Sequence, residues 1–331
     1  MVREFQPLNA LYLTGLLWTP NKYPVNLQAN RAQFRNFLLA RTTIRWFNDG
    51  MTEIEQTRIQ EREALIARIS NLLESDQRFL AAWLEGSLGR GSFDAWSDID
   101  LWTVVRDEDF AQVVSDRYAI METMGSCVLK VESPQNGPAN GIYLMAGFET
   151  ASGIQLVDWY CQPASQACRS NSLAVFFIRP ELSRMESWRS SMPEDGISAI
   201  FSRSRQGEDS LRSDEPYVAW HPNTEQDALN AGNLAWAMVM IQAKHIFRHP
   251  NEPGLPFESF LSKLVKKASG GVQTLRPSTI DMEGPSDRLD RLVDITGGII
   301  RAVPADTKLK DGIIRYLNAV RQALPMDARA R

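Results

Sequence analysis

Two aspartates stand one residue apart in the segment SDIDLW, and a Gly-Ser pair, Gly86 and Ser87, begins twelve residues before the first of them. In an extended strand, residues two apart point to the same face, about 6.5 Å apart along the chain. We therefore expect Asp98 and Asp100 to project together, while Ile99 faces the opposite side. Adjacent carboxylates repel each other unless a positive group neutralises them. Mg²⁺ is suited to this, because it binds a few carboxylates together with phosphate oxygens.

A third carboxylate, Asp158, lies inside the apolar segment IQLVDWY, where a charged side chain is out of place without a function. If its strand neighbours that of the aspartate pair, three carboxylates converge on a site for two metal ions. Such a site clamps the attacking and leaving oxygens of a phosphoryl displacement. We predict that Asp98, Asp100 and Asp158 bind metal and carry the catalysis.

Gly86 and Ser87 suit phosphate binding. Because glycine has no side chain, a phosphate can approach the backbone, where the following N–H groups and the serine hydroxyl donate hydrogen bonds. A helix starting within residues 88–93 would add the positive end of its dipole. Arg90 offers a charge-assisted contact to a triphosphate, and Ser97 is expected either to cap the start of the strand or to contact phosphate. These four residues are the predicted nucleotide-binding set.

The elements expected around these residues form an α+β domain. Apolar residues recur at helical spacing up to Ser75, starting near Glu53, and residues 107–125 predict a second helix with acids in its first turn. Short apolar, β-branched or aromatic runs predict strands. They cover residues 78–85, 98–105, 126–132, 141–149, 154–160 and 173–179, and the fourth and fifth form a hairpin.

After Pro180 the pattern becomes helical. Helices are predicted over residues 225–247, 257–268 and 307–324, and the polar segment 202–216 is expected to be a linker. We divide the chain into an N-terminal extension (1–52), a mixed-sheet α+β domain (53–180) and an all-helical bundle domain (181–331). Met51 begins a segment typical of a natural chain start, so we expect residues 1–50 to be dispensable.

Composition narrows the class of protein. The 331 residues carry a net charge of −4, which argues against binding long nucleic acid, since that needs a basic face. Three cysteines fit free thiols in a reducing cytoplasm better than a disulfide framework. No run approaches the roughly 18 apolar residues of a membrane span. The sequence thus favours a cytoplasmic protein that acts on a small molecule.

The order Gly-Ser, ten residues, Asp-Ile-Asp and a distant strand aspartate resembles the nucleotidyltransferase superfamily with the DNA polymerase beta-like fold. The segment ESDQRFLAAWLEGSLGRGSFDAWSDIDLW is similar to that of bacterial antibiotic nucleotidyltransferases, which modify aminoglycosides or lincosamides. The resemblance covers about residues 60–180. It implies that Gly86 and Ser87 hold nucleotide phosphates and that Asp98, Asp100 and Asp158 bind metal.

The resemblance further implies a reaction. It is the Mg²⁺-dependent transfer of AMP from ATP to a hydroxyl of an antibiotic-type small molecule, with release of pyrophosphate and antibiotic resistance as the outcome. The helical domain would then bind the acceptor, and a homodimer stays open. Glu225 and Asp227 are candidates for a general base, although acids in a first helical turn also complement the helix dipole.

Other readings stay open beside this one. A nucleotidyltransferase of this kind can modify a protein, as in a toxin–antitoxin pair, or a tRNA end. The chain can also be a non-catalytic nucleotide-binding module. The acidic balance weighs against tRNA, the helical domain weighs against the minimal protein-modifying type, and the three aspartates weigh against a non-catalytic module.

Two histidines, His245 and His249, stand four residues apart, a spacing that metal ligands on a helix use. His221 is the one other histidine in the chain. The sequence therefore favours a solvent-facing or capping role for the pair near Pro250.

Overall fold

The structure of the chain is a computed structural model. It describes residues 51–133, 136–138, 140–167, 174–185, 188, 224–252, 258–271 and 284–324. The predicted N-terminal extension up to residue 50 and the predicted linker 202–216 lie outside the described residues.

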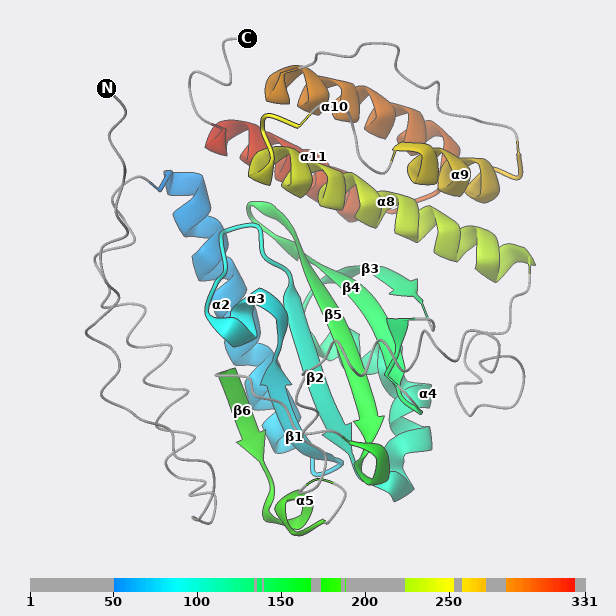
Figure 1. The fold of residues 1–331 in the computed structure, drawn as a ribbon. Helices are drawn as coiled ribbons and strands as arrows, with labels where there is room; N and C mark the ends of the chain where they lie inside the picture. Colours follow the sequence, from blue (N-terminus) through cyan, green and yellow to red (C-terminus); the bar gives the residue numbers. More distant parts are fainter. Residues whose placement is uncertain are drawn as a thin grey trace.

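A mixed six-stranded sheet forms the centre of the first half of the chain, with strand order β3-β4-β5-β2-β1-β6 (Figure 1). Its strands are β1 (Phe79–Leu84), β2 (Ile99–Val105), β3 (Cys127–Glu132), β4 (Ile142–Thr150), β5 (Gly153–Pro163) and β6 (Ala174–Ile178). Among the described strands, β2 and β5 form the one parallel pair. The six predicted strands and the β4–β5 hairpin are confirmed.

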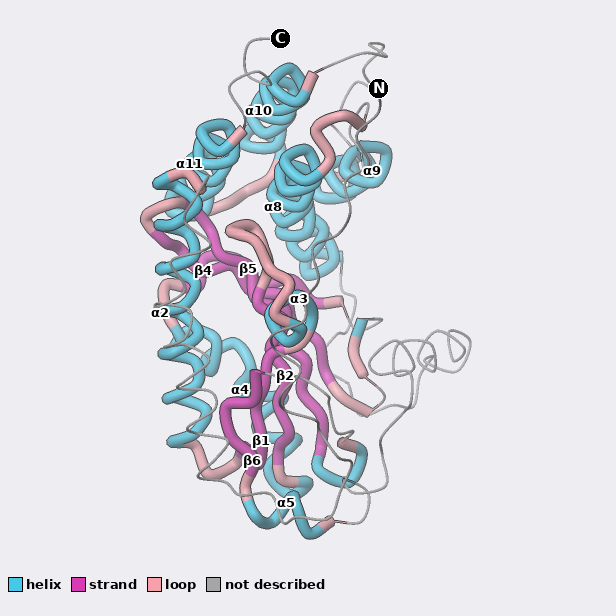
Figure 2. The backbone as a smooth tube through the Cα atoms, turned by 60° about the vertical axis from the view of Figure 1, so that its left-hand side comes forward, coloured by secondary structure: helices cyan, strands magenta, loops and turns pink. Residues whose placement is uncertain are grey.

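Two helices, α2 (Glu53–Ser75) and α4 (Asp107–Met124), lie on the same side of the sheet (Figure 2). At the start of α2, Thr52 and Glu55 form a capping box, which satisfies backbone N–H groups that have no partner inside the helix. Alternate residues of β2, such as Ile99 and Leu101, pack into the apolar cluster between the sheet and these helices. This side of the sheet is a closed core.

The second half of the chain is helical and lies beyond one end of the sheet (Figure 1). It comprises α8 (Thr224–Arg248), α9 (Glu258–Ala268), α10 (Pro285–Ala302) and α11 (Thr307–Ala323). The fold class, α+β with a mixed sheet followed by a helical region, is confirmed. The sequence reading did not predict α10.

The helical region packs directly onto the sheet, because α8 and α11 share an apolar cluster with β3, β4 and β5. Gly153 permits the close approach of α11 to the β4–β5 hairpin. Its φ is +131°, and a Cβ at this position would lie 2.6 Å from the backbone nitrogen of Tyr316. Two further short helices are α3 (Gly86–Arg90) and α5 (Pro180–Arg184).

Within the described residues, every helix is too short or too polar to cross a membrane.

Candidate functional site

The three predicted carboxylates meet at the centre of the sheet. Strands β2 and β5 run parallel, and Asp100 is paired in register with Asp158. Residues paired across neighbouring strands point to the same face of a sheet, so these two side chains lie side by side. Asp98 stands directly before β2, and its charge acts on both of the other carboxylates. The structure therefore brings the three together, while their role as metal ligands stays a prediction.

The cluster is electrostatically strained. Burial, followed by the charge of Asp98, raises the pKa of Asp100 to about 6. Burial and the charges of its two partners also raise the pKa of Asp158. The hydroxyl of Tyr143 donates a 2.7 Å hydrogen bond to Asp158 Oδ1, which opposes this shift. Burial and mutual repulsion thus make Asp100 and Asp158 easier to protonate than free carboxyls.

A lysine from the helical region contacts the cluster. Lys244, in α8, donates a hydrogen bond from its Nζ to Asp98 Oδ2, and both side chains are largely buried. Although burial lowers the pKa of an ammonium, the adjacent Asp98 raises the pKa of Lys244 above its ordinary value. The pKa values of Asp100 and Asp158 stay raised beside Lys244, so this ammonium does not fully offset burial and the repulsion among the carboxylates.

The carboxylate of Asp100 leaves no room for a side chain at Gly86. Its φ is +59°, in the left-handed region, and a Cβ there would lie 1.9 Å from Asp100 Oδ2. Any side chain at this position would therefore strain the backbone and displace the carboxylate. The sequence reading had assigned this glycine to phosphate approach, and the structure adds the contact with Asp100 as a physical reason for it.

The helix expected to start within residues 88–93 starts at Gly86 instead and ends at Arg90. It stops there because Gly91 adopts the left-handed conformation, with φ of +75°. A helix of only five residues sums few peptide dipoles. The expected contribution of a helix N-terminus to anion binding is therefore weak.

The other predicted nucleotide-binding residues divide into two groups. Ser87 is half-buried, and within the described part of the chain its hydroxyl makes no hydrogen bond. Arg90 is exposed, and its charge lowers the pKa of Asp100 against the larger effect of burial. Ser97, by contrast, is buried, and its hydroxyl is bonded to Asp94 within the turn before β2. Of its two predicted roles, the structure thus shows the one at the start of the strand.

Helix α8 holds this turn from the helical side. Arg248 donates two hydrogen bonds of 2.8 Å to the carboxylate of Asp94, from Nε and Nη2. Together with the Lys244–Asp98 pair, this gives α8 two charged contacts around the aspartate site. The contacts cross 154 and 146 residues of sequence, which is why sequence reading missed both cations.

Helix α2 holds the same turn from the opposite side. Arg58 donates to the carbonyl of Ala95 at 3.3 Å, and Arg62 donates to the carbonyl of Asp94 at 2.6 Å. The guanidinium of Arg58 also lies between the rings of Trp96 and Tyr316, 4.7 and 4.6 Å from their centroids. The backbone leading to Asp98 is therefore fixed by groups from three helices.

An aromatic row adjoins the carboxylates on the same face. Trp102 and Tyr160 stand two residues after Asp100 and Asp158 in their strands, and their rings stack with centroids 4.8 Å apart. The row continues to Trp83 on β1 and Tyr143 on β4. This apolar wall contributes to the burial that raises the carboxyl pKa values.

Glu225 and Asp227, the candidates for a general base, lie in the first turns of α8, but their side chains are outside the described part of the structure.

No protein-family model matches the chain, and no curated protein matches it either. Among solved structures, the chain is similar to a STING-associated CdnE c-di-GMP synthase from Capnocytophaga granulosa. Sequence identity is 12% and the TM-score is 0.24, over 90% of this chain and 97% of that one. A likeness at this level carries no conclusion about activity, which has to rest on the residues of the site.

Proposed function

We propose that the chain is a nucleotidyltransferase that transfers AMP from ATP to a hydroxyl of a small molecule and releases pyrophosphate. The observation that carries the proposal is the in-register pairing of Asp100 with Asp158 beside Asp98. Three carboxylates on one face are costly unless they serve a ligand. They also restrict position 86 to glycine, because a side chain there would collide with Asp100.

The donor set fits hard divalent cations. The residues that would hold Mg²⁺ are Asp98, Asp100 and Asp158, since Mg²⁺ prefers carboxylate oxygens together with phosphate oxygens. The raised pKa of Asp100 and the pairing of Lys244 with Asp98 both indicate negative charge in need of compensation. When bound, a pair of such ions supplies neutralisation of the charge on the transferred phosphoryl group.

The remaining polar groups at the site suit the triphosphate. The hydroxyl of Ser87 and the exposed guanidinium of Arg90 lie in α3, which starts next to Asp100. Lys244 adds an ammonium at Asp98 from the helical side. In the proposed reaction, an acceptor oxygen bonds to the α-phosphorus while the bond from that phosphorus to the pyrophosphate oxygen breaks. The acceptor proton passes to a base or to solvent, and these residues contribute positioning and charge.

The acceptor class rests on the resemblance of residues 60–180 to the enzymes that modify aminoglycosides and lincosamides. The helical region reaches the carboxylates through Lys244, so it is placed to border an acceptor next to the site.

The test is incubation of the chain with Mg²⁺, ATP labelled at the α-phosphate, and a panel of aminoglycosides and lincosamides. We expect Mg²⁺-dependent label on a drug, its loss in Asp98→Asn, and full activity in Glu108→Gln, an exposed carboxylate on α4. Label on a protein, on tRNA or on a second nucleotide would keep the chemistry and replace the acceptor. Absence of transfer to any of these, or full transfer by Asp98→Asn, would contradict the proposal.

A further inference from the structure

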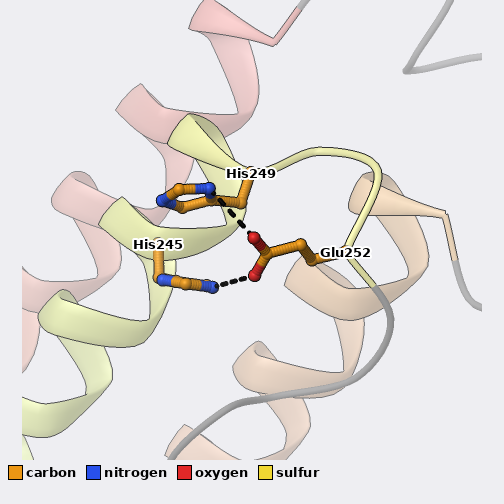
Figure 3. A group of neighbouring side chains, drawn as sticks. All are labelled: His245, His249 and Glu252. Atoms are coloured by element: carbon orange, nitrogen blue, oxygen red, sulfur yellow. Dashed lines mark hydrogen bonds and ion pairs between the residues drawn. The ribbon is translucent and has the colours of Figure 1, made fainter.

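A second group of metal-capable side chains lies at the end of α8, outside the carboxylate site. The two histidines stack, with ring centroids 4.4 Å apart, and Glu252 turns back to face both rings (Figure 3). Its carboxylate lies 2.9 Å from His245 Nε2 and 3.2 Å from His249 Nδ1. The spacing of the two histidines is visible in the sequence, whereas the approach of Glu252 to both rings depends on the turn after α8.

The donor atoms match a zinc-type ion in kind and in spacing. Two imidazole nitrogens and one carboxylate oxygen are a set that Zn²⁺ uses, with bonds of about 2.0–2.2 Å and tetrahedral geometry. That geometry separates neighbouring donors by about 3.3 Å, and the donor atoms here lie within 4.8 Å of one another. Small ring rotations bring the two nitrogens together, because His249 and Glu252 are exposed and His245 is partly so.

The backbone already holds this arrangement. The N–H of Glu252 donates to the carbonyl of His249, which fixes the turn that returns the carboxylate to the helix. Arg288, fully buried in α10, donates to the carbonyls of His249 and Pro250 at 3.2 and 2.7 Å. A metal ion would therefore meet ligands that need little ordering, which lowers the entropic cost of binding.

We propose that His245, His249 and Glu252 form a binding site for a zinc-type transition metal, separate from the carboxylate site. The ion replaces the contacts between the rings and the carboxylate, and leaves a fourth position for water. The same turns of α8 direct Lys244 to Asp98 and Arg248 to Asp94. Metal at this site therefore stabilises the end of the helix that contacts the carboxylates.

The experiment is a titration of the full chain, without a histidine tag, with Zn²⁺, followed by thermal unfolding. Co²⁺ absorption reports ligand geometry in parallel. We expect one zinc ion to raise the melting temperature and Co²⁺ to give a tetrahedral spectrum. Both should persist in an Asp98→Asn, Asp158→Asn variant, which removes carboxylates of the other site. The double variant therefore distinguishes failure of the zinc site from failure of the proposed function.

Loss of a ligand should then abolish binding. His249→Ala and Glu252→Gln should weaken Zn²⁺ affinity by more than about a hundredfold, since even groups that only orient metal ligands contribute about 10- to 100-fold. Asp294→Asn, an exposed carboxylate on α10, is the matched control and should bind as the unaltered chain does. Unchanged Zn²⁺ affinity in the ligand variants, or loss of the stabilisation in the double aspartate variant, would overturn the proposal.

Discussion

The two faces of the sheet are built from the same strands, but one face forms the apolar core and the other carries the aspartate site. On the side of α2 and α4, alternate residues such as Ile99, Leu101 and Trp159 are buried in an aliphatic and aromatic core. On the other side, the residues between them include Asp100 and Asp158. Because the side-chain period of a strand is two, a single residue step separates a core position from a site position.

The difference between the faces lies in what burial costs. Burying Leu101 stabilises the fold, whereas burial raises the pKa of Asp100 and so disfavours its charged form. The site face is therefore held in place by the core face and by charged groups of α8. Substitutions on the two faces should separate activity from stability.

The largest expected effect is on the site face. Asp100→Asn should lower kcat/KM for nucleotidyl transfer by about 10²- to 10³-fold, as when a group that stabilises charge in the transition state is lost. The fold should persist, because Asn is close to Asp in size. Steady-state kinetics alongside circular dichroism measures both. Activity within tenfold of the unaltered chain would remove Asp100 from the proposed mechanism.

At the next residue, Leu101, we expect the opposite result: a loss of stability without a loss of activity. Leu101→Ala should lower the free energy of unfolding by about 2–5 kcal/mol, the usual cost of a cavity in a packed core. The folded fraction should keep the kcat of the unaltered chain. Denaturant unfolding gives the free energy, and Ile314→Ala, at an exposed position, is the control that should change it by less than about 0.5 kcal/mol. An equal loss in both variants would mean that this face is not the stabilising one.

At Gly86 we expect a loss of both stability and activity. Gly86→Ala should cost about 1–2 kcal/mol through its left-handed backbone and should also displace the Asp100 carboxylate, which lowers activity. Gly270→Ala is the matched control: its φ is +62°, yet a Cβ there meets nothing within 4 Å. The expected pattern is destabilisation in Gly86→Ala at least as large as in Gly270→Ala, with activity lost only in Gly86→Ala. Full activity in Gly86→Ala would show that the contact is unimportant.

The smallest effect concerns stability and pH. Because the pKa of Asp100 is raised from 3.8 to about 6 in the folded chain, its contribution to stability is present below about pH 4 and lost as pH rises through 6. Without metal, Asp100→Asn should therefore gain in melting temperature relative to the unaltered chain between pH 4.5 and pH 7. Calorimetry in a chelating buffer measures this difference. A melting temperature of Asp100→Asn, minus that of the unaltered chain, that falls or stays constant over this range would contradict the raised pKa.

Much of the sheet could be predicted from the sequence, because short apolar runs between turn residues leave few alternatives to a strand. The carboxylates could be predicted for a related reason, since Asp158 stands out in an apolar strand. Helix α10 was missed because Gly297 and Gly298 interrupt it, and each glycine costs about 1 kcal/mol in a helix. Its apolar residues nevertheless recur at helical spacing and pack into the bundle.

The partners of the carboxylates could not be predicted. Lys244 and Arg248 reach the site from far along the chain, and nothing in the local pattern of α8 distinguishes them from solvated cations. Gly86 could be recognised as important, but its contact with Asp100 depends on how the turn before α3 approaches β2. Such contacts follow from the packing of whole elements, which single-sequence patterns do not encode.

The most direct measurement is a crystal structure of the chain with Mn²⁺ and a non-hydrolysable ATP analogue, using the anomalous signal of manganese. The account predicts manganese within about 2.0–2.3 Å of carboxylate oxygens of Asp98, Asp100 and Asp158, with the triphosphate on the same face. Manganese bound elsewhere, or at a site that Asp158 does not reach, would contradict it.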